Sequence, residues 1–411
     1  MAEKPQIAPF SAERRARRRA ARRAADKRLR TVARLRHFFG WVTAAAFVLF
    51  WAANMSLFSR DSLHQLGSII TAGLDHADAG TLIQYATENT ATVSAYADGL
   101  AVADSDVFNL QKPGAVQLTE PLGYSSPTLL SNEHYVFAYD RGGYSAMLTT
   151  SISVTSKVTL ESPIITGCLG QNGDYALITN ETGYKSAVTV FSANGEQRFK
   201  WATPDYYFES VALSPDGRRL AVAAFSQTET EFEGTLFFRD LGSEEISSQV
   251  SLGSTVPLAA GFLDGDTAAV VGDYGTFIVS RKGETIKSIG YAADDLDAYC
   301  FGEGSLVLGT HSYSGKARTS LSIFDAEGAE TGPLLAAEDL QAIGYDGARL
   351  ALLTASGLRV YDSALRPLWE NASAAGARAI LLNADGSVWA AYSKQADRLS
   401  ASSDTSEALK S

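Results

Sequence analysis

The side chains best suited to binding chemistry are aromatic and charged residues in short loops between predicted strands. These loops read DRGGY (Asp140–Tyr144), NETGYK (Asn180–Lys185), TPDYYF (Thr203–Phe208) and THSYSGKAR (Thr310–Arg318). Exposed aromatic and arginine side chains are enriched at the energetic centres of protein interfaces. The candidate binding residues are Arg141, Tyr144, Tyr184, Lys185, Tyr206, Tyr207 and Arg318.

Catalytic chemistry has no comparable candidate in this sequence. The five histidines are scattered, and none stands with cysteine or aspartate at the spacing of a metal site. No glycine-rich phosphate loop followed by Lys and Ser or Thr is present. We therefore predict no catalytic residue, no bound metal and no cofactor. Cys168 and Cys300 lie in equivalent strands of distant repeats, and a disulfide needs Cα atoms within about 7 Å, so we expect two free, buried thiols.

The loops that carry the candidate residues belong to a repeating region, residues 91–393. A strand, a turn of the type DG or NG, and a second strand recur through it. Examples are Val93–Val102, Val211–Ala223 and Ala379–Ala390. Many short strands at even spacing indicate an all-β fold. A period of roughly 35–45 residues is the length of a four-stranded propeller blade, so we predict a β-propeller.

Counting the repeats favours eight blades over seven. Full copies begin near Thr92, Pro127, Ile164, Glu209, Pro257, Asp297 and Gln341. An eighth copy, Ala377–Ser393, holds only two inner strands. We expect its missing outer strands to come from the other end of the chain, where Thr81–Ala86 is the candidate, together with Leu66–Thr71.

Blade topology places the candidate residues on one face. In a four-stranded blade the loop between strands two and three shares a face with the link to the next blade. On this face the candidate aromatic residues are therefore expected to lie among basic and acidic side chains. The acidic ones are Glu229, Glu231 and Glu233, in a further loop between second and third strands. This composition suits a protein or peptide partner. Nucleic acid is less favoured because the region after residue 58 is acidic.

A single apolar segment precedes the propeller. Phe38–Phe58 holds no charged residue, and about 20 apolar residues span a bilayer as one helix. Residues 1–37 carry 13 Lys and Arg against three acidic residues, whereas the remaining 22 basic and 43 acidic residues give −21. Because basic flanks stay in the cytoplasm, we predict a cell-membrane protein with its amino terminus inside. A cleaved signal peptide fits less well, since its apolar region is shorter and ends in paired small residues.

The segments that flank the apolar segment and the propeller are interpreted in the same way. The arm, residues 1–37, has no apolar face and is expected to contact anionic lipid, which attracts basic segments. Nucleic-acid binding by the arm is less favoured because no aromatic residue is interleaved with its arginines. Residues 59–90 are interpreted as a stalk that can supply closing strands, and the polar residues 394–411 as a disordered tail.

Three stretches resemble known repeats. Leu213–Ala223 (LSPDGRRLAVA) is similar to the SPDG turn of WD40-like and TolB-type propellers. Ser192–Trp201 and Ser363–Trp369 are similar to the Trp-ended repeats of quinoprotein-like propellers. The layout of residues 38–393, with YDRGGY at Tyr139–Tyr144, resembles an uncharacterised bacterial family of single-pass membrane proteins with an extracytoplasmic propeller, a domain of unknown function. The resemblance implies fold and topology but no activity.

Two functional hypotheses follow. The leading one is a membrane-anchored, extracytoplasmic binding or scaffold module for an envelope protein, peptide or glycan. The alternative is a propeller enzyme, a hydrolase or lyase acting on an envelope polymer. Such enzymes concentrate carboxylates, histidine or a metal at the axis, whereas the predicted inner strands offer mostly Ala, Val, Leu and Gly.

The predicted topology can be tested by cysteine labelling in intact cells. A membrane-impermeant thiol reagent should label Ser403→Cys and leave Ser11→Cys unlabelled, because the positive flank holds the amino terminus inside. Labelling of Ser11→Cys alone would reject this topology.

Overall fold

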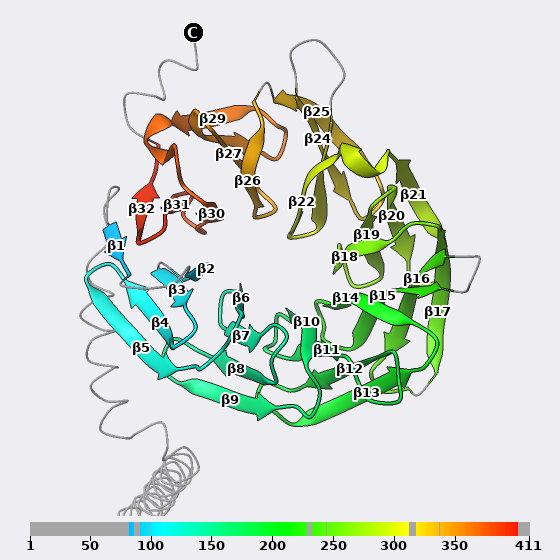
Figure 1. The fold of residues 1–411 in the computed structure, drawn as a ribbon. Coiled ribbons are helices and arrows are strands. Elements are labelled where there is room, and N and C mark those ends of the chain that lie inside the picture. Colours follow the sequence, from blue (N-terminus) through cyan, green and yellow to red (C-terminus); the bar gives the residue numbers. More distant parts are fainter. Residues whose placement is uncertain are drawn as a thin grey trace, which may run out of the picture. The chain divides into compact units, whose positions relative to one another are not determined.

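The chain folds as an all-β propeller of eight blades, as the repeats predicted (Figure 1). The structure is a computed structural model that describes residues 82–85, 91–97, 99–227, 232–243, 245–311, 318–336 and 338–401. Every blade is a four-stranded antiparallel sheet, and blades follow one another around a ring in sequence order.

Two sets of strands form the inner half of the blades. The innermost strands are β2 (Thr92–Tyr96), β6 (Pro127–Ser131), β10 (Ile164–Leu169), β14 (Tyr207–Leu213), β18 (Pro257–Phe262), β22 (Leu296–Gly302), β26 (Leu340–Tyr345) and β30 (Ala379–Leu382). The second strands are β3 (Gly99–Ala103), β7 (Val136–Asp140), β11 (Tyr175–Thr179), β15 (Arg219–Gln227), β19 (Thr267–Gly272), β23 (Ser305–His311), β27 (Arg349–Thr354) and β31 (Val388–Ala391). The innermost strands begin within two residues of the predicted repeat starts.

Two further sets complete the blades towards the rim. The third strands are β4 (Val107–Lys112), β8 (Ser145–Thr149), β12 (Ser186–Phe191), β16 (Phe232–Asp240), β20 (Gly275–Ser280), β24 (Thr319–Asp325), β28 (Gly357–Asp362) and β32 (Gln395–Leu399). The outer strands are β5 (Ala115–Pro121), β9 (Val154–Thr159), β13 (Gln197–Thr203), β17 (Ile246–Gly253), β21 (Thr285–Gly290), β25 (Glu330–Ala336), β29 (Pro367–Asn371) and β1 (Leu82–Gln84). Two 3₁₀ turns, η2 (Ala293–Asp295) and η3 (Ala372–Ala374), lie in links.

Burial explains why the sequence shows short, continuous apolar runs. Every residue of β11 and β12 is buried, whereas the outer strand β13 is mostly exposed or half-buried. The middle strands of a blade are covered on both faces by neighbouring blades, so both sets of alternating side chains must be apolar or hydrogen-bonded. The core therefore consists of layers between blades.

The antiparallel order defines two faces of the ring. The "2–3 face" carries the loops between second and third strands and the links between blades; the "1–2 face" carries the other turns. A turn on the 1–2 face shows the predicted chemistry: Gly217 takes φ +64°, and its N–H donates to the Ser214 carbonyl (2.8 Å). The Ser214 hydroxyl donates to Asp216 (2.6 Å) and holds the pKa of that carboxyl below its usual value.

The ring closes by pairing the two ends of the described chain. Strand β1 pairs antiparallel with β32, with Leu82 opposite Asp397 and Gln84 opposite Gln395, so the first and last strands lie side by side (Figure 1). Ile83 is buried between blades 8 and 1. The buried Tyr85 hydroxyl donates to the Gln395 carbonyl (2.8 Å) and contacts that of Tyr392.

This closure corrects two sequence-based expectations. The eighth blade has three strands from the carboxy-terminal end and takes one strand from the other end. Residues 395–399, expected within a disordered tail, form β32. This segment looks polar in the sequence because Arg398 is charged. The Arg398 guanidinium pairs with Asp385, however, and Ala396 and Leu399 of the same strand are buried.

Other expectations fall outside the described residues. These are the basic arm 1–37, the apolar segment 38–58, the stalk up to residue 81 with its Leu66–Thr71 strand, and the tail beyond residue 401. Within the described part of the chain, no helix has the length and apolarity needed to span a membrane.

Truncation tests the role of β32. Ending the chain after Lys394 should remove β32, leave β1 without a partner and expose the edge of β31, so the protein should melt at lower temperature and aggregate. Ending it after Ala401 keeps every described strand and is the control. Thermal unfolding with light scattering measures both; equal melting of the two proteins would contradict closure by β32.

Candidate functional site

Six of the seven candidate binding residues lie in loops or links of the 2–3 face, and the seventh, Tyr207, is the first residue of β14 at the same face. Arg141 and Tyr144 lie between β7 and β8 of blade 2, and Tyr184 and Lys185 between β11 and β12 of blade 3. The remaining three are Tyr206 and Tyr207, at the link into blade 4, and Arg318, which precedes β24 of blade 6.

Lys185 and Tyr207 meet at the junction of blades 3 and 4. The Lys185 ammonium lies 4.8 Å from the Tyr207 ring centroid and donates to the Asp205 carbonyl (3.1 Å). The Tyr207 ring stacks on Phe225 (5.2 Å between centroids), which stacks on Phe232 (4.9 Å). We call these three rings the aromatic ladder.

The aromatic ladder lies at the end of the β15–β16 hairpin, whose strands are longer than the strands beside them. Strands β15 and β16 have nine residues each and pair out to Gln227 and Phe232. The innermost strand β14 begins opposite Phe225, so the end of the hairpin projects beyond it on the 2–3 face. The sequence analysis placed Glu229, Glu231 and Glu233 in a loop and did not single out Phe225 or Phe232. Glu233 instead belongs to β16, while Glu229 and Glu231 lie outside the described residues.

The three aromatic residues of the TPDYYF link have different environments. Tyr207 is 40% exposed, whereas Phe208 is buried against Trp201 (4.6 Å between centroids). Tyr206 is half-buried, with its ring edge-on to Phe237 (4.8 Å). Thus Tyr207 is available to a partner, while Tyr206 and Phe208 hold the link against blade 4.

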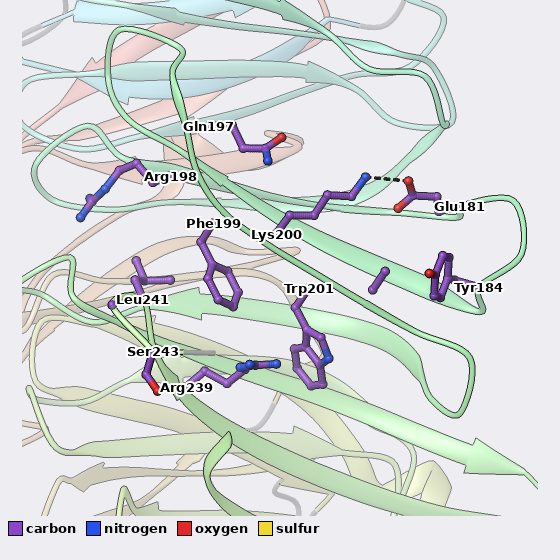
Figure 2. A pocket seen from close by; sticks show the side chains of 12 residues that line it. Glu181, Tyr184, Gln197, Arg198, Phe199, Lys200, Trp201, Arg239, Leu241 and Ser243 are labelled. Atoms are coloured by element: carbon purple, nitrogen blue, oxygen red, sulfur yellow. Dashed lines mark hydrogen bonds and ion pairs between the residues drawn. The ribbon is translucent and has the colours of Figure 1, made fainter. Parts of the chain in front are cut away.

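A groove adjoins Tyr184 at the rim of blades 3 and 4 (Figure 2). We call it the rim groove; its volume is about 870 Å³. Its lining consists of Glu181, Tyr184, the strand residues Gln197, Arg198, Phe199, Lys200, Trp201 and Ala202, and Arg239, Leu241, Gly242 and Ser243.

The rim groove combines rings with basic side chains. The buried guanidinium of Arg239 lies 4.6 Å from the Trp201 ring centroid and 5.3 Å from that of Phe199. Lys200 is paired with Glu181 (2.6 Å), as Figure 2 shows. Arg198 pairs with Asp174, outside the lining. Three lining residues are therefore basic and one is acidic, in a chain whose net charge is −11.

The other candidates do not join this cluster. Among the described residues, no hydrogen bond, ion pair or ring contact connects Tyr144 or Arg318 to Lys185 or the aromatic ladder. Arg141 instead acts on Glu209, a residue of the innermost strand β14 that the sequence did not single out. Burial raises the pKa of Glu209, and the positive charge of Arg141 opposes part of that rise.

Among the described residues, His311 and Asp297 do not form a catalytic relay with a hydroxyl group. Asp297 accepts a hydrogen bond from the Thr319 hydroxyl (2.6 Å), and His311 Nδ1 lies 3.9 Å from the same carboxylate. A relay needs the imidazole between hydroxyl and carboxylate, and here the carboxylate lies between. In the described ranges, no three His, Cys, Asp or Glu side chains converge as a metal site.

Both thiols are free, as the sequence predicted, since Cys168 and Cys300 form no disulfide. Burial raises the pKa of the Cys168 thiol to about 12 and also raises that of Cys300. Neither thiol is therefore ionised near neutral pH.

The different environments of Tyr206 and Tyr207 predict different stability effects. Tyr206→Ala should lower the free energy of unfolding by about 2 kcal/mol, because a half-buried ring leaves Phe237. Tyr207→Ala should lower it by less than about 1 kcal/mol, since that ring is already exposed. Denaturant unfolding of both variants checks the order, and the reverse order would contradict these environments.

Comparison with known proteins identifies relatives of the fold. The chain is similar to BamB from Moraxella catarrhalis, with 12% identity and a TM-score of 0.52 over 78% of this chain and 98% of that one. It is also similar to Chaetomium thermophilum Sqt1 bound to the N-terminus of the ribosomal protein L10, with 15% identity and a TM-score of 0.53 over 78% and 100%. At such identities the likeness shows the propeller fold alone.

The family assignment comes from the sequence itself. No curated protein matches the chain. Residues 79–370, which include most of the propeller, match the family of unknown function DUF5711. This match confirms the expected kinship with an uncharacterised family, and the chain therefore belongs to DUF5711.

Proposed function

We propose that this chain is a membrane-anchored, extracytoplasmic binding module that captures an envelope protein or peptide. The proposed site, which we call the rim site, comprises the aromatic ladder, Tyr184 with Lys185, and the rim groove. The observation that carries the proposal is the exposure of two tyrosines here: Tyr184 is 48% and Tyr207 is 40% exposed.

The geometry of the rim site suits an extended peptide segment. Stacking on Phe225 and the contact with Lys185 restrain the exposed Tyr207 ring, so binding would order few additional side chains. The groove beside Tyr184 offers rings and basic groups, which favour a segment with apolar and acidic side chains. Sqt1, a propeller of similar fold, binds a terminal segment of another protein, and this supports a peptide ligand in general.

The points where the chain enters and leaves the propeller are consistent with a membrane tether on the amino-terminal side. Strand β1 runs antiparallel to β32, so the described chain enters the propeller at Leu82 and leaves it at Leu399, both on the 1–2 face. A tether through the preceding residues would then join the propeller on its 1–2 face. The aromatic ladder and Tyr184 lie on the 2–3 face and would be available to partners in the extracytoplasmic space. The rim groove extends from Tyr184 along β13 to the β16–β17 turn, which lies on the 1–2 face.

Photo-crosslinking in intact cells tests this function. A photoreactive amino acid at Thr182, an exposed position in the same loop as Tyr184, should capture a partner from the envelope. In that background, Tyr184→Ser with Tyr207→Ser should weaken capture by about 2 kcal/mol or more, roughly 30-fold, if the rings are energetic centres. Both rings are exposed, so the fold should persist.

A matched control is available on the same face. Tyr274 is 54% exposed in the β19–β20 turn of blade 5, and Tyr274→Ser should leave capture unchanged. Normal capture by a folded double variant would place the partner elsewhere. Equal loss in the control and the double variant would show that the effect is not specific to the rim site.

A further inference from the structure

The turns of the 1–2 face surround a concave region at the axis of the ring. Its part next to blades 8, 1 and 2, which are neighbours in Figure 1, is a cavity of about 490 Å³ that we call the junction cavity. Pockets that bind small organic groups measure about 300–1,000 Å³, so this cavity has a suitable size. No residue of the rim site lines it, and a ligand here would be additional to the partner proposed above.

The wall of the junction cavity contains a buried hydrogen-bond acceptor without a donor. Asn383 lines the cavity and is 4% exposed, and its Oδ1 accepts no hydrogen bond within the described ranges. Its Nδ2 donates to the hydroxyl oxygen of Ser387 (2.8 Å), a residue that does not line the cavity. Oδ1 is therefore the amide atom turned towards the cavity. Because leaving a buried acceptor unsatisfied is costly, a donor supplied by a ligand would be favourable here.

The orientation of the Asn383 amide is set by its neighbours. The Ser387 hydroxyl donates its single proton to Asp385 (2.7 Å), and its oxygen accepts from Asn383 Nδ2 and from Arg398 Nε (2.9 Å). Reversing the amide would place Oδ1 against an oxygen that has no proton left to donate. The unsatisfied atom is therefore the oxygen, and the cavity needs a ligand that donates.

Arg398 presents a fixed guanidinium to the same cavity. It is 8% exposed, and its bonds to Ser387 and Asp385 hold the guanidinium in one orientation. On the core side, its Cζ lies 6.0 Å from the centroid of the Trp389 ring. Guanidinium groups stack on aromatic rings, so an aromatic ligand in the cavity would find a second favourable contact.

The remaining walls include small apolar side chains. Ala95, Ala97, Leu382 and Ala384 line the cavity and offer no side-chain donor or acceptor. Ala97 takes a left-handed backbone conformation (φ +51°) that favours glycine or asparagine. Alanine at this position gives the wall a methyl group without adding a polar group. These walls suit a flat apolar body.

We propose that the junction cavity binds an indole group, supplied either by a tryptophan of a partner peptide or by a free indole compound. The indole N–H donates to Asn383 Oδ1, and the ring lies against Arg398 and the alanine walls. Oδ1 is covered in the structure, so the wall beside it shifts on binding; Ala97 and Ala384 are exposed, and movement of their turns disturbs little core packing.

Indole fits this cavity better than a phenol does. The indole nitrogen only donates, whereas a phenol oxygen also carries lone pairs that the apolar walls would leave without a donor. The inference does not rest on the rim site.

Calorimetric titration of the full-length chain in detergent tests the proposal with two probes, indole and N-acetyltryptophanamide. At least one should bind. The analogue of each probe that is methylated on the indole nitrogen should bind about tenfold more weakly, because it cannot donate to Oδ1. Binding of indole alone would identify a free compound as the source, and binding of N-acetyltryptophanamide a peptide tryptophan. Titration into detergent without protein corrects for partition of the probes into micelles.

Asn383→Leu removes the acceptor and should abolish the preference for the unmethylated probe, while thermal unfolding checks that the variant is folded. If it does not fold, the preference shown by the unaltered chain decides the test. Absence of binding by both probes at millimolar concentration would overturn the proposal. Equal binding of the methylated analogues to the unaltered chain would also overturn it, as would a preference that persists in folded Asn383→Leu.

Two controls separate this cavity from other sites. Asn194 lies in the β12–β13 turn on the same face, where its Oδ1 accepts from the Ser192 hydroxyl (2.9 Å), and Asn194→Leu should bind the probes normally. Tyr184→Ser with Tyr207→Ser should also bind them normally, so failure of the rim site and failure of the junction cavity are distinguishable. Loss of binding in either control would show that the effect is not specific to Asn383.

Discussion

Closure of the ring is the constraint on which the rest of the structure depends. Each blade is stable because neighbours cover both faces of its middle strands, and the last interface forms only when blades 8 and 1 meet. Ile83 and Tyr85 pack there with Leu100, Val102 and Trp389. A short strand from the start of the described chain thus completes an apolar layer and also pairs its backbone with β32. Opening this one junction would expose two blade faces together.

The interactions between blades also position the rim site. Trp201, Phe208 and Phe237 form one packed layer between blades 3 and 4. That layer fixes the link and so directs Tyr207 outwards, onto the projecting hairpin. The exposed rings therefore rest on core packing and do not depend on a long loop, which is why they can be rigid and still accessible.

Sequence reasoning located the blades because their turns are chemically distinctive. A Gly after Asp or Asn marks the backbone reversal, and apolar runs beside it mark strands covered on both faces. It missed β32 because the polar side chains of Gln395, Asp397 and Arg398 hide a strand signal. Arg398 is accommodated there because Asp385 and Ser387, in the neighbouring turn, accept hydrogen bonds from its guanidinium.

The candidate sites were predictable only in part, because they depend on relations between blades. The seven predicted residues do share one face, but the sequence YYF does not reveal which ring is exposed. That outcome depends on Trp201 and Phe237, which come from two different blades. The concave region at the axis of the ring, on the 1–2 face, was not predicted at all. Its lining comes from turns spread over residues 95–398, and no local pattern records their convergence.

The direction of β1 has a mechanical consequence. A pull on Leu82 along the line of the strand, away from Gln84, acts parallel to β1 and β32. The hydrogen bonds between Leu82–Gln84 and Gln395–Asp397 would then be loaded together in shear, and not opened one after another as in peeling. Tension on the amino-terminal side of the propeller is thus shared by the whole of its shortest strand pairing and by the buried Ile83.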